Sequence, residues 1–350
     1  MIIIGEKING SIPSVAAAIA ERDAELIRQR AIAQAEAGAA FIDCCASVPE
    51  AQEPETLKWM IDCIQEVTDL PISLDSPSPR VLAQVIPYCR RPGLINSVSM
   101  EGDKCDVVFP IIADTQWQVI GLLCDDTGIP KCAADRLRVF DKLMAKAEEY
   151  GIAPDRIHID PLIEMLCTSE EGIAVNEEVI SSVRRQYPEI HITAAVSNIS
   201  FNLPVRKLIN QGFTMMAMRC GLDSAILDPL NKDLMGLIRA AEALLSRGMD
   251  ADTDLSEIES LVEEKNRKYV LPAYAVLALR NGVIELEPDE YDEYDLETVK
   301  EELMAKGSAG YSERDLLGLL YAAVALMGRD DYCMNYIGAY RDGTIGPVKA

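Results

Sequence analysis

Clustered metal-binding side chains are lacking in this sequence. It holds only two histidines, and its cysteines are scattered without a Cys-x-x-Cys pair. Zinc and iron–sulfur sites need clustered thiolates or imidazoles, so we expect this chain to bind no metal of its own. Most of the thiols are better explained as small buried apolar groups in a reducing cytosol. The ten cysteines occupy positions 44, 45, 63, 89, 105, 124, 132, 167, 220 and 333.

Positive charge and long apolar runs are also scarce. The formal charge is −24 and the sequence pI is near 4.5, which argues against nucleic acid or an anionic membrane surface as a partner. No apolar run approaches the roughly 20 residues that span a bilayer. The N-terminal residues, Met1 to Glu6, become acidic too early for a signal peptide. We therefore expect a soluble, cytoplasmic protein.

Strand-like and helix-like segments alternate through about residue 248. This pattern predicts an α/β fold, a (β/α)8 TIM barrel over residues 1–248. A doubly wound open sheet would favour a Gly-x-Gly-x-x-Gly loop after the first strand, and the sequence has none. The predicted strands are 2–5, 40–45, 71–75, 94–98, 118–124, 157–160, 191–197 and 224–228. Predicted helices include 54–67, 133–150, 176–187, 206–218 and 233–246.

The last hundred residues predict a helical C-terminal extension, 249–350, packed on the barrel or on a dimer partner. Helices are expected at 255–265, 269–279 and 315–327, the last with a cap at Ser312. The acidic segment 287–295 predicts a solvated face or, alternatively, a contact for a basic surface of a partner. Three methionines of the 206–218 helix and both histidines are expected to be buried core residues: Met215, Met216, Met218, His158 and His191.

Four short apolar runs of strand length end in an acid or an amide, at Asp75, Asn96, Asp160 and Asn198. In parallel α/β folds the C-terminal strand ends share one face, where these folds carry their chemistry. Acids and amides suit a flat, nitrogen-rich heterocycle held by hydrogen bonds. A structural explanation competes with this interpretation. Asp75 could cap a helix, and Asp160 could end a strand in a turn before Pro161.

The sequence resembles the methyltetrahydrofolate:corrinoid-protein methyltransferase family over roughly residues 1–248. Several segments carry the resemblance in order: Ile4-Gly5-Glu6-Lys7-Ile8-Asn9-Gly10, Leu74-Asp75-Ser76, Ile95-Asn96-Ser97, Gly128-Ile129-Pro130-Lys131, Ile159-Asp160-Pro161-Leu162 and Ser197-Asn198-Ile199-Ser200. That family is a pterin-binding TIM barrel, similar to the folate domain of cobalamin-dependent methionine synthase and more distantly to dihydropteroate synthase.

The resemblance implies a methyltransferase that moves a methyl group between N5 of tetrahydrofolate and the cobalt of a corrinoid protein, in either direction. The cobalamin is carried by that partner protein, and family members are commonly homodimers. The implied catalytic residue is Asn198, at N5. The implied folate-binding residues are Asp75, Asn96 and Asp160 on the pterin ring, Ser197 and Arg206 lining the site, and Glu6 and Asn9 in the first-strand motif.

Two positions depart from the family pattern. The family usually reads Asp-x-Asn after the second strand, and here the segment is Asp43-Cys44-Cys45. Phe201 stands where relatives can carry glutamine. Two alternatives stay open, the second of them because of these departures. One is a dihydropteroate-synthase-like enzyme, and the other is a non-catalytic protein that binds folate or docks a corrinoid protein. The ultimate methyl donor also stays open among a methoxyaromatic, a betaine, another methylamine and the acetyl-CoA pathway.

Overall fold

The computed structural model describes residues 1–288, 294–307 and 310–347, so most of the acidic segment 287–295 lies outside the described residues. The chain forms two compact units. The first contains Met1–Leu162, Glu178–Ala195 and Leu222–Leu230. The second contains Ile163–Glu177, Val196–Gly221 and Asn231–Ala350. The predicted division after residue 248 stays a prediction.

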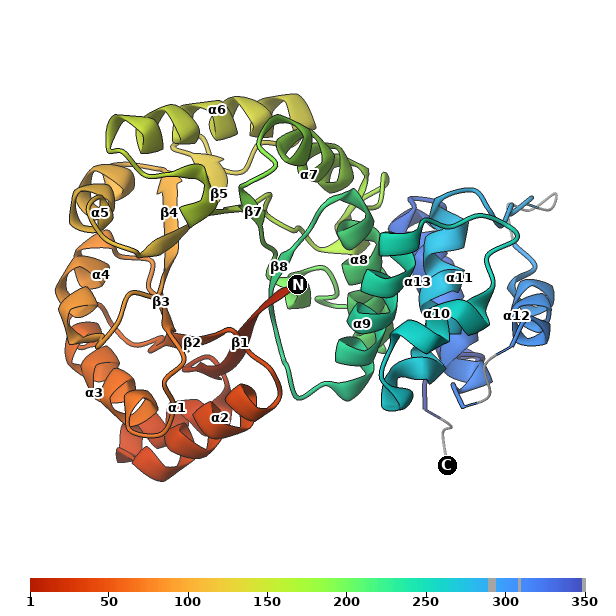
Figure 1. Cartoon of the computed structure of the whole chain (residues 1–350), viewed down its shortest axis with the longest axis horizontal. Coiled ribbons are helices and arrows are strands. Elements are labelled where there is room, and N and C mark those ends of the chain that lie inside the picture. Colours follow the sequence, from red (N-terminus) through yellow and green to blue (C-terminus); the bar gives the residue numbers. More distant parts are fainter. Residues whose placement is uncertain (289–293, 308–309, 348–350) are drawn as a thin grey trace. The chain divides into compact units, whose positions relative to one another are not determined.

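The first unit holds an eight-stranded parallel sheet in the order β7-β6-β5-β4-β3-β2-β1-β8. A parallel bridge between Ala195 and Ile226 joins the end of the β7 segment to β8, which nearly closes the barrel. Figure 1 shows these strands as a ring. This confirms the predicted TIM barrel. The strands are β1 (Ile2–Asn9), β2 (Phe41–Cys45), β3 (Ile72–Asp75), β4 (Leu94–Met100), β5 (Gln118–Asp125), β6 (Ile157–Asp160), β7 (His191–Ile192) and β8 (Ser224–Leu227).

Seven helices lie between these strands along the chain as far as β7, and each packs an apolar stripe inward. Asp23 and Ser78 cap α2 and α4, where their side chains accept backbone N–H groups of the first turn. The helices are α1 (Pro13–Glu21), α2 (Ala24–Glu36), α3 (Glu53–Gln65), α4 (Pro79–Val85), α5 (Lys104–Ile112), α6 (Ala133–Glu149) and α7 (Ala174–Gln186), the last divided between the two units.

The prediction of a strand through residue 197 is wrong. Regular pairing in β7 ends at Ile192, and Val196–Asn198 forms a 3-10 turn. The intervening backbone still bonds both neighbours, because the Thr193 amide donates to the Ile159 carbonyl and the Ile226 amide donates to the Ala194 carbonyl. Asn198 therefore lies in a turn beyond the barrel strand.

Most of the residues predicted to lie in the core are buried, and His191 is the exception among the histidines. His158 is fully buried, with Nε2 2.7 Å from Gln118 Oε1 and Nδ1 3.2 Å from Ser224 Oγ. Burial lowers the pKa of His158 to about 3, so the ring is neutral. Half-buried His191 bonds Asp223 at 2.9 Å, so the prediction of full burial is wrong for this ring. All ten cysteines are free and most are buried, and the three methionines of α8 (Arg206–Cys220) are buried.

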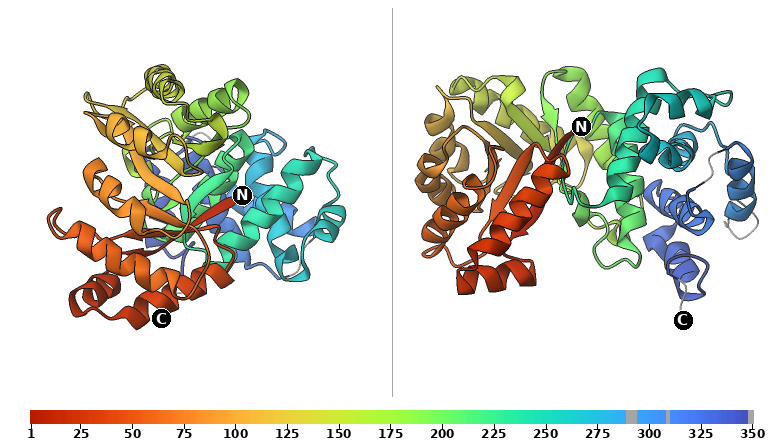
Figure 2. Two further views of the ribbon diagram at one scale, coloured as in Figure 1. Left: turned by 60° about the vertical axis from the view of Figure 1, so that its left-hand side comes forward. Right: turned by 60° about the horizontal axis from the view of Figure 1, so that its bottom comes forward.

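The described part of the second unit consists of helices and loops, coloured green to blue in Figure 2. It includes two helices, α11 and α13, that are buried on nearly all sides. Ser312 caps α13 as predicted, accepting the Asp315 amide at 3.2 Å. The helices are α8, α9 (Lys232–Arg247), α10 (Leu255–Leu261), α11 (Val270–Arg280), α12 (Leu296–Ala305), α13 (Glu313–Leu326) and α14 (Met334–Arg341).

The helix predicted over 255–265 is too long. It ends at Leu261 because Val262 is extended, and a 3-10 helix over Glu264–Tyr269 follows. Helices α12 and α14 have no counterpart in the prediction. Among the described residues, no helix combines the length and the apolar character that a membrane span needs.

Candidate functional site

Four polar side chains from neighbouring strands form a row: the last residues of β1, β2 and β3, and Asn96 of β4. Asn96 does not end its strand as expected, because β4 continues to Met100. Asn9 pairs with Cys45, Cys45 with Asp75, and Asp75 with Asn96. Because the strands are parallel and these residues are register partners, the sheet places them side by side. Three of the predicted folate-binding residues, Asn9, Asp75 and Asn96, are thus brought together.

A fifth residue, Asp43, lies two positions before Cys45 on the same face of β2. It is buried, and its Oδ1 accepts hydrogen bonds from Ser73 Oγ at 2.7 Å and Asn96 Nδ2 at 3.1 Å. Sequence reasoning did not count Asp43 among the site residues. The signal that could have found it is a carboxylate inside the otherwise apolar strand Phe41–Cys45, because such a group needs partners when it is buried.

The carboxyl groups of this row hold their protons more strongly than usual. Burial raises the pKa of Asp43 well above its ordinary value, and the charge of Asp75 raises it further. Burial also raises the pKa of Asp75 to about 6, opposed by a hydrogen bond from the Cys45 thiol. Cys45 therefore supplies a hydrogen-bond donor to Asp75. The cluster can both accept and donate hydrogen bonds near neutral pH.

Asp75 does not cap a helix. Helix α4 begins after Ser78, whose hydroxyl accepts the Val81 amide at 3.4 Å. The helix-cap explanation of Asp75 is thus wrong, and its buried carboxyl needs a different account.

Asp160 ends β6, away from the four-residue row, and it does support a turn. Its Oδ1 accepts the Leu162 amide at 2.8 Å. Burial raises its pKa to about 6, although the nearby Arg136 guanidinium opposes the shift. Arg136 is itself buried and donates to the carbonyls of Pro130, Pro161 and Leu162. The loop after β6 is therefore rigidly held around one carboxyl group.

The first-strand residues have local partners. Asn9 Oδ1 accepts the Ser11 amide at 2.9 Å and the Ser47 hydroxyl at 3.3 Å. Lys7 Nζ lies 3.1 Å from Asp228 Oδ2 at the end of β8. The half-buried Glu6 is close enough for its charge to raise the pKa of Asp43.

The remaining predicted residues, Ser197, Asn198 and Arg206, lie together in the second unit. Arg206 folds back so that its guanidinium donates to the Ser197 carbonyl at 2.6 Å and its Nε donates to Ser200 Oγ at 3.0 Å. The guanidinium also stacks on the Phe201 ring, 4.6 Å from its centroid. Asn198 is half-buried, and within the described part of the chain its side-chain amide makes no hydrogen bond.

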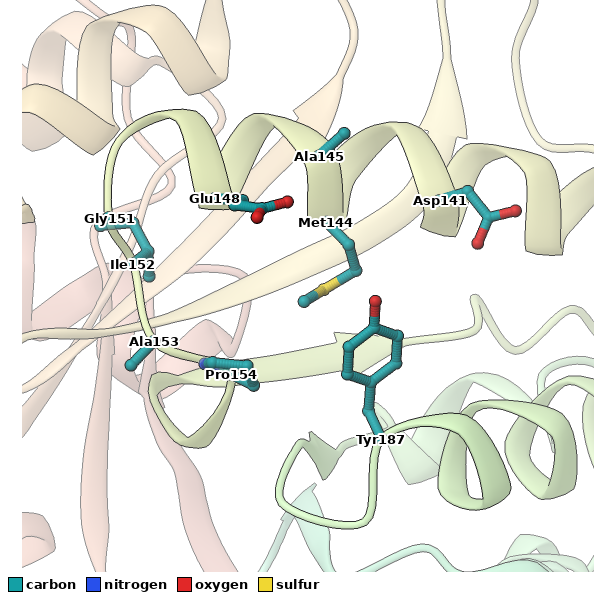
Figure 3. Close-up of a pocket in the computed structure, with 9 residues that line it drawn as sticks. All are labelled: Asp141, Met144, Ala145, Glu148, Gly151, Ile152, Ala153, Pro154 and Tyr187. Atoms are coloured by element: carbon teal, nitrogen blue, oxygen red, sulfur yellow. The ribbon is translucent and has the colours of Figure 1, made fainter.

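A groove of about 530 Å³ lies elsewhere on the first unit, between α6 and the end of α7. Figure 3 shows the Tyr187 hydroxyl directed toward Met144 and its neighbours on α6. Residues 151–154 and Tyr187 precede β6 and β7, so the groove lies at the N-terminal ends of the strands. In this fold that end serves stability, whereas the chemistry belongs to the opposite end.

The described residues contain no group of three or more His, Cys, Asp or Glu side chains that could hold a metal ion.

The chain is similar to proteins that handle pterins and folates. The family described as pterin binding enzyme matches residues 6–228. A methylcorrinoid:tetrahydrofolate methyltransferase from Eubacterium limosum is 47% identical over 247 residues, which cover 70% of this chain and 91% of that protein. A methionine synthase from Mycobacterium tuberculosis is 29% identical over 241 residues, but the match covers 65% of this chain and only 20% of that protein.

Among solved structures, a dihydropteroate synthase from Xanthomonas albilineans aligns with a TM-score of 0.50 and 20% identity, covering 70% of this chain and 92% of that one. This likeness shows the barrel fold alone. The family match includes all four residues of the row. The chain therefore belongs to the pterin binding enzyme family.

Proposed function

We propose that this protein transfers a methyl group from a methylated corrinoid protein to N5 of tetrahydrofolate. The observation that carries the proposal is the 47% identity to the methylcorrinoid:tetrahydrofolate methyltransferase, which extends over 91% of that protein. The direction follows the printed activity of that relative. The reverse direction is the same reaction read backwards and uses the same residues.

The row at the strand ends supports the binding half of the proposal. A reduced pterin carries N–H donors along its 2-amino-4-oxo edge, and a carboxylate can accept two of them while an amide accepts and donates. We assign Asp75, Asn96 and Asp160 to this edge. The pKa values of Asp75 and Asp160 are raised because both carboxyl groups are buried. Buried carboxyl groups of this kind are suited to bind a ligand that donates N–H groups. We also propose Glu6 and Asn9 of the first unit, and Ser197 and Arg206 of the second unit, as folate-binding residues.

The reaction balances without a metal bound to this chain. The lone pair of N5 forms the new N–C bond while the Co–C bond breaks, and both electrons of that bond stay on cobalt, which goes from Co(III) to Co(I). N5 becomes positive during the step and then loses its proton to solvent. The corrinoid, carried by its own protein, is a substrate here.

Asn198 is the proposed catalytic residue. Its amide can accept a hydrogen bond from the positive N5–H in the transition state, and in the reverse direction it can first donate to the N5 lone pair. An amide does both by turning, without ionising. The side chain suits this role because it makes no hydrogen bond within the described residues.

The partner is a corrinoid protein, and we further propose a cytoplasmic homodimer. Sedimentation of the purified protein tests the dimer, and fractionation of cells tests the compartment.

A spectroscopic assay tests the proposed activity. Methylcobalamin, free or bound to a corrinoid protein, is mixed anaerobically with tetrahydrofolate and the protein, and the loss of its absorbance is followed together with the methyltetrahydrofolate formed. The proposal predicts stoichiometric transfer that depends on the protein. Folate binding without transfer in either direction would instead identify a non-catalytic folate-binding protein.

A further inference from the structure

The C-terminal helices share one compact unit with two barrel loops, residues 163–177 and 196–205. At one contact the Ile173 amide donates to the Leu326 carbonyl at 3.0 Å. Gly172 and Gly328 meet here with positive φ, and a Cβ on Gly172 would lie 2.2 Å from the Leu326 oxygen. Backbones approach this closely only where glycine leaves out its side chain. The loop after β6 is therefore fixed against the end of α13.

The second contact centres on Tyr336 of α14. Its side chain is fully buried, and its hydroxyl lies 3.2 Å from the Pro204 carbonyl and 3.1 Å from the Val205 carbonyl. The start of α14 is fixed in turn, because Asp330 accepts the amides of Asn335 and Tyr336 at 2.8 and 2.9 Å. Burial raises the pKa of Tyr336, so the phenol stays protonated and donates at any working pH.

A short series of contacts leads from Tyr336 to the Asn198 turn. Val205 adopts a left-handed conformation and starts α8, so Arg206 follows directly and holds the Ser197 carbonyl. On the other side of Asn198, the Ile199 carbonyl accepts the Leu166 amide at 2.9 Å. Asn198 is thus flanked by two backbone groups that the surrounding unit holds in place.

We propose that Tyr336 is a positioning residue for Asn198. This inference rests on the proposed function and extends it to a part of the chain well beyond residue 228, where the family match ends. The Tyr336 hydroxyl fixes the backbone at Val205, and the neighbouring Arg206 holds the Ser197 carbonyl. The backbone that carries the Asn198 side chain is thereby kept in place. A side chain remote from the reacting atoms then affects the rate through geometry.

Tyr336→Phe removes the hydroxyl and leaves the ring that fills the core. Tyr274→Phe is the matched control, because Tyr274 is also buried and its hydroxyl also meets a backbone carbonyl, that of Asp250, at 3.3 Å. We expect Tyr336→Phe to lower kcat about three- to tenfold with an unchanged KM for tetrahydrofolate. Tyr274→Phe should leave kcat unchanged. An equal loss in both variants would overturn the proposal.

A double-mutant cycle with Asn198→Ala then separates positioning from general damage. Once Asn198 is gone, Tyr336→Phe should cause no further loss of rate. A loss that multiplies that of Asn198→Ala would show that Tyr336 acts elsewhere.

Hydrogen exchange tests the positioning without any activity. The Phe201 and Leu203 amides bond the carbonyls of Asn198 and Ser200 within the turn. Tyr336→Phe should speed their exchange, and Tyr274→Phe should not. If the wild type shows no methyl transfer but this difference is seen, the proposed function fails and the anchoring role stands. If exchange does not change, the anchoring role fails.

Discussion

Replacing Asp160 with asparagine should stabilise the protein and weaken its binding of tetrahydrofolate. Asp160 is only 6% exposed, and burial raises its pKa from 3.8 to about 6. The folded state therefore holds this proton more tightly than the unfolded chain does. The free energy of unfolding consequently falls as pH rises from about 4 to about 6, and it stays lower above that range.

The size of the effect follows from the pKa. A difference of one in pKa corresponds to about 1.4 kcal/mol. Ionising Asp160 in the folded state, relative to the unfolded chain, therefore costs up to about 3 kcal/mol at neutral pH. Asparagine has the same shape, and its oxygen can keep the hydrogen bond from the Leu162 amide. It loses the attraction of Arg136, so we expect a measured gain of about 1–2 kcal/mol.

Urea unfolding without ligand, at about pH 7.5 and about pH 4, measures this gain. The gain should be present at the higher pH and nearly absent at the lower. Titration with tetrahydrofolate at the higher pH should show an affinity at least about tenfold weaker, because an amide N–H would face a ring N–H.

Asp125→Asn provides a control of opposite sign. Hydrogen bonds from Thr127 and Lys142 lower the pKa of Asp125. Its replacement should lower the free energy of unfolding at neutral pH and leave folate affinity unchanged. If Asp160→Asn destabilised the protein at neutral pH, or kept full folate affinity, the proposal that the Asp160 carboxyl group binds the folate would be refuted.

Two further predictions concern the same carboxyl groups. Affinity for tetrahydrofolate should fall as pH drops through about 6, because Asp75 and Asp160 then gain protons and lose their capacity to accept ring N–H groups. Fluorescence titration across this pH range measures the affinity. An affinity that does not change with pH would contradict the prediction. Asn96→Ala should lower the free energy of unfolding by about 1–3 kcal/mol in urea, because buried Asp43 loses one of its two hydrogen bonds. An unchanged midpoint of urea unfolding would show that the hydrogen bond from Asn96 to Asp43 contributes nothing to stability.

The barrel could be predicted because its strands are continuous apolar runs that need burial on both faces. The end of β7 could not. Residues 193–195 remain extended through bonds to partner strands, and the turn at Asn198 is held by Arg206 and by the Leu166 amide. Those contacts come from distant parts of the chain, so the periodicity of a single segment cannot predict them.

The strand-end residues could likewise be found from their positions, but their surroundings could not. Asp43 joins the site only because Ser73 and Asn96, 30 and 53 residues later, come to lie beside it. The contact that the C-terminal helices make with the Asn198 loop could not be predicted from the sequence either. Tyr336 acts at a loop 131 residues earlier, and nothing in the composition of the tail marks that contact.

Single-turnover methyl transfer by the wild type and by Asn198→Ala tests the central claim most directly. Methylcorrinoid and tetrahydrofolate are mixed with excess protein, and the rate of the step is measured together with folate affinity. We predict rapid transfer by the wild type. For Asn198→Ala we predict a rate at least about 100-fold lower, with folate affinity nearly unchanged. Equal rates for the two proteins would contradict the role of Asn198, and no transfer by the wild type would contradict the proposed function itself.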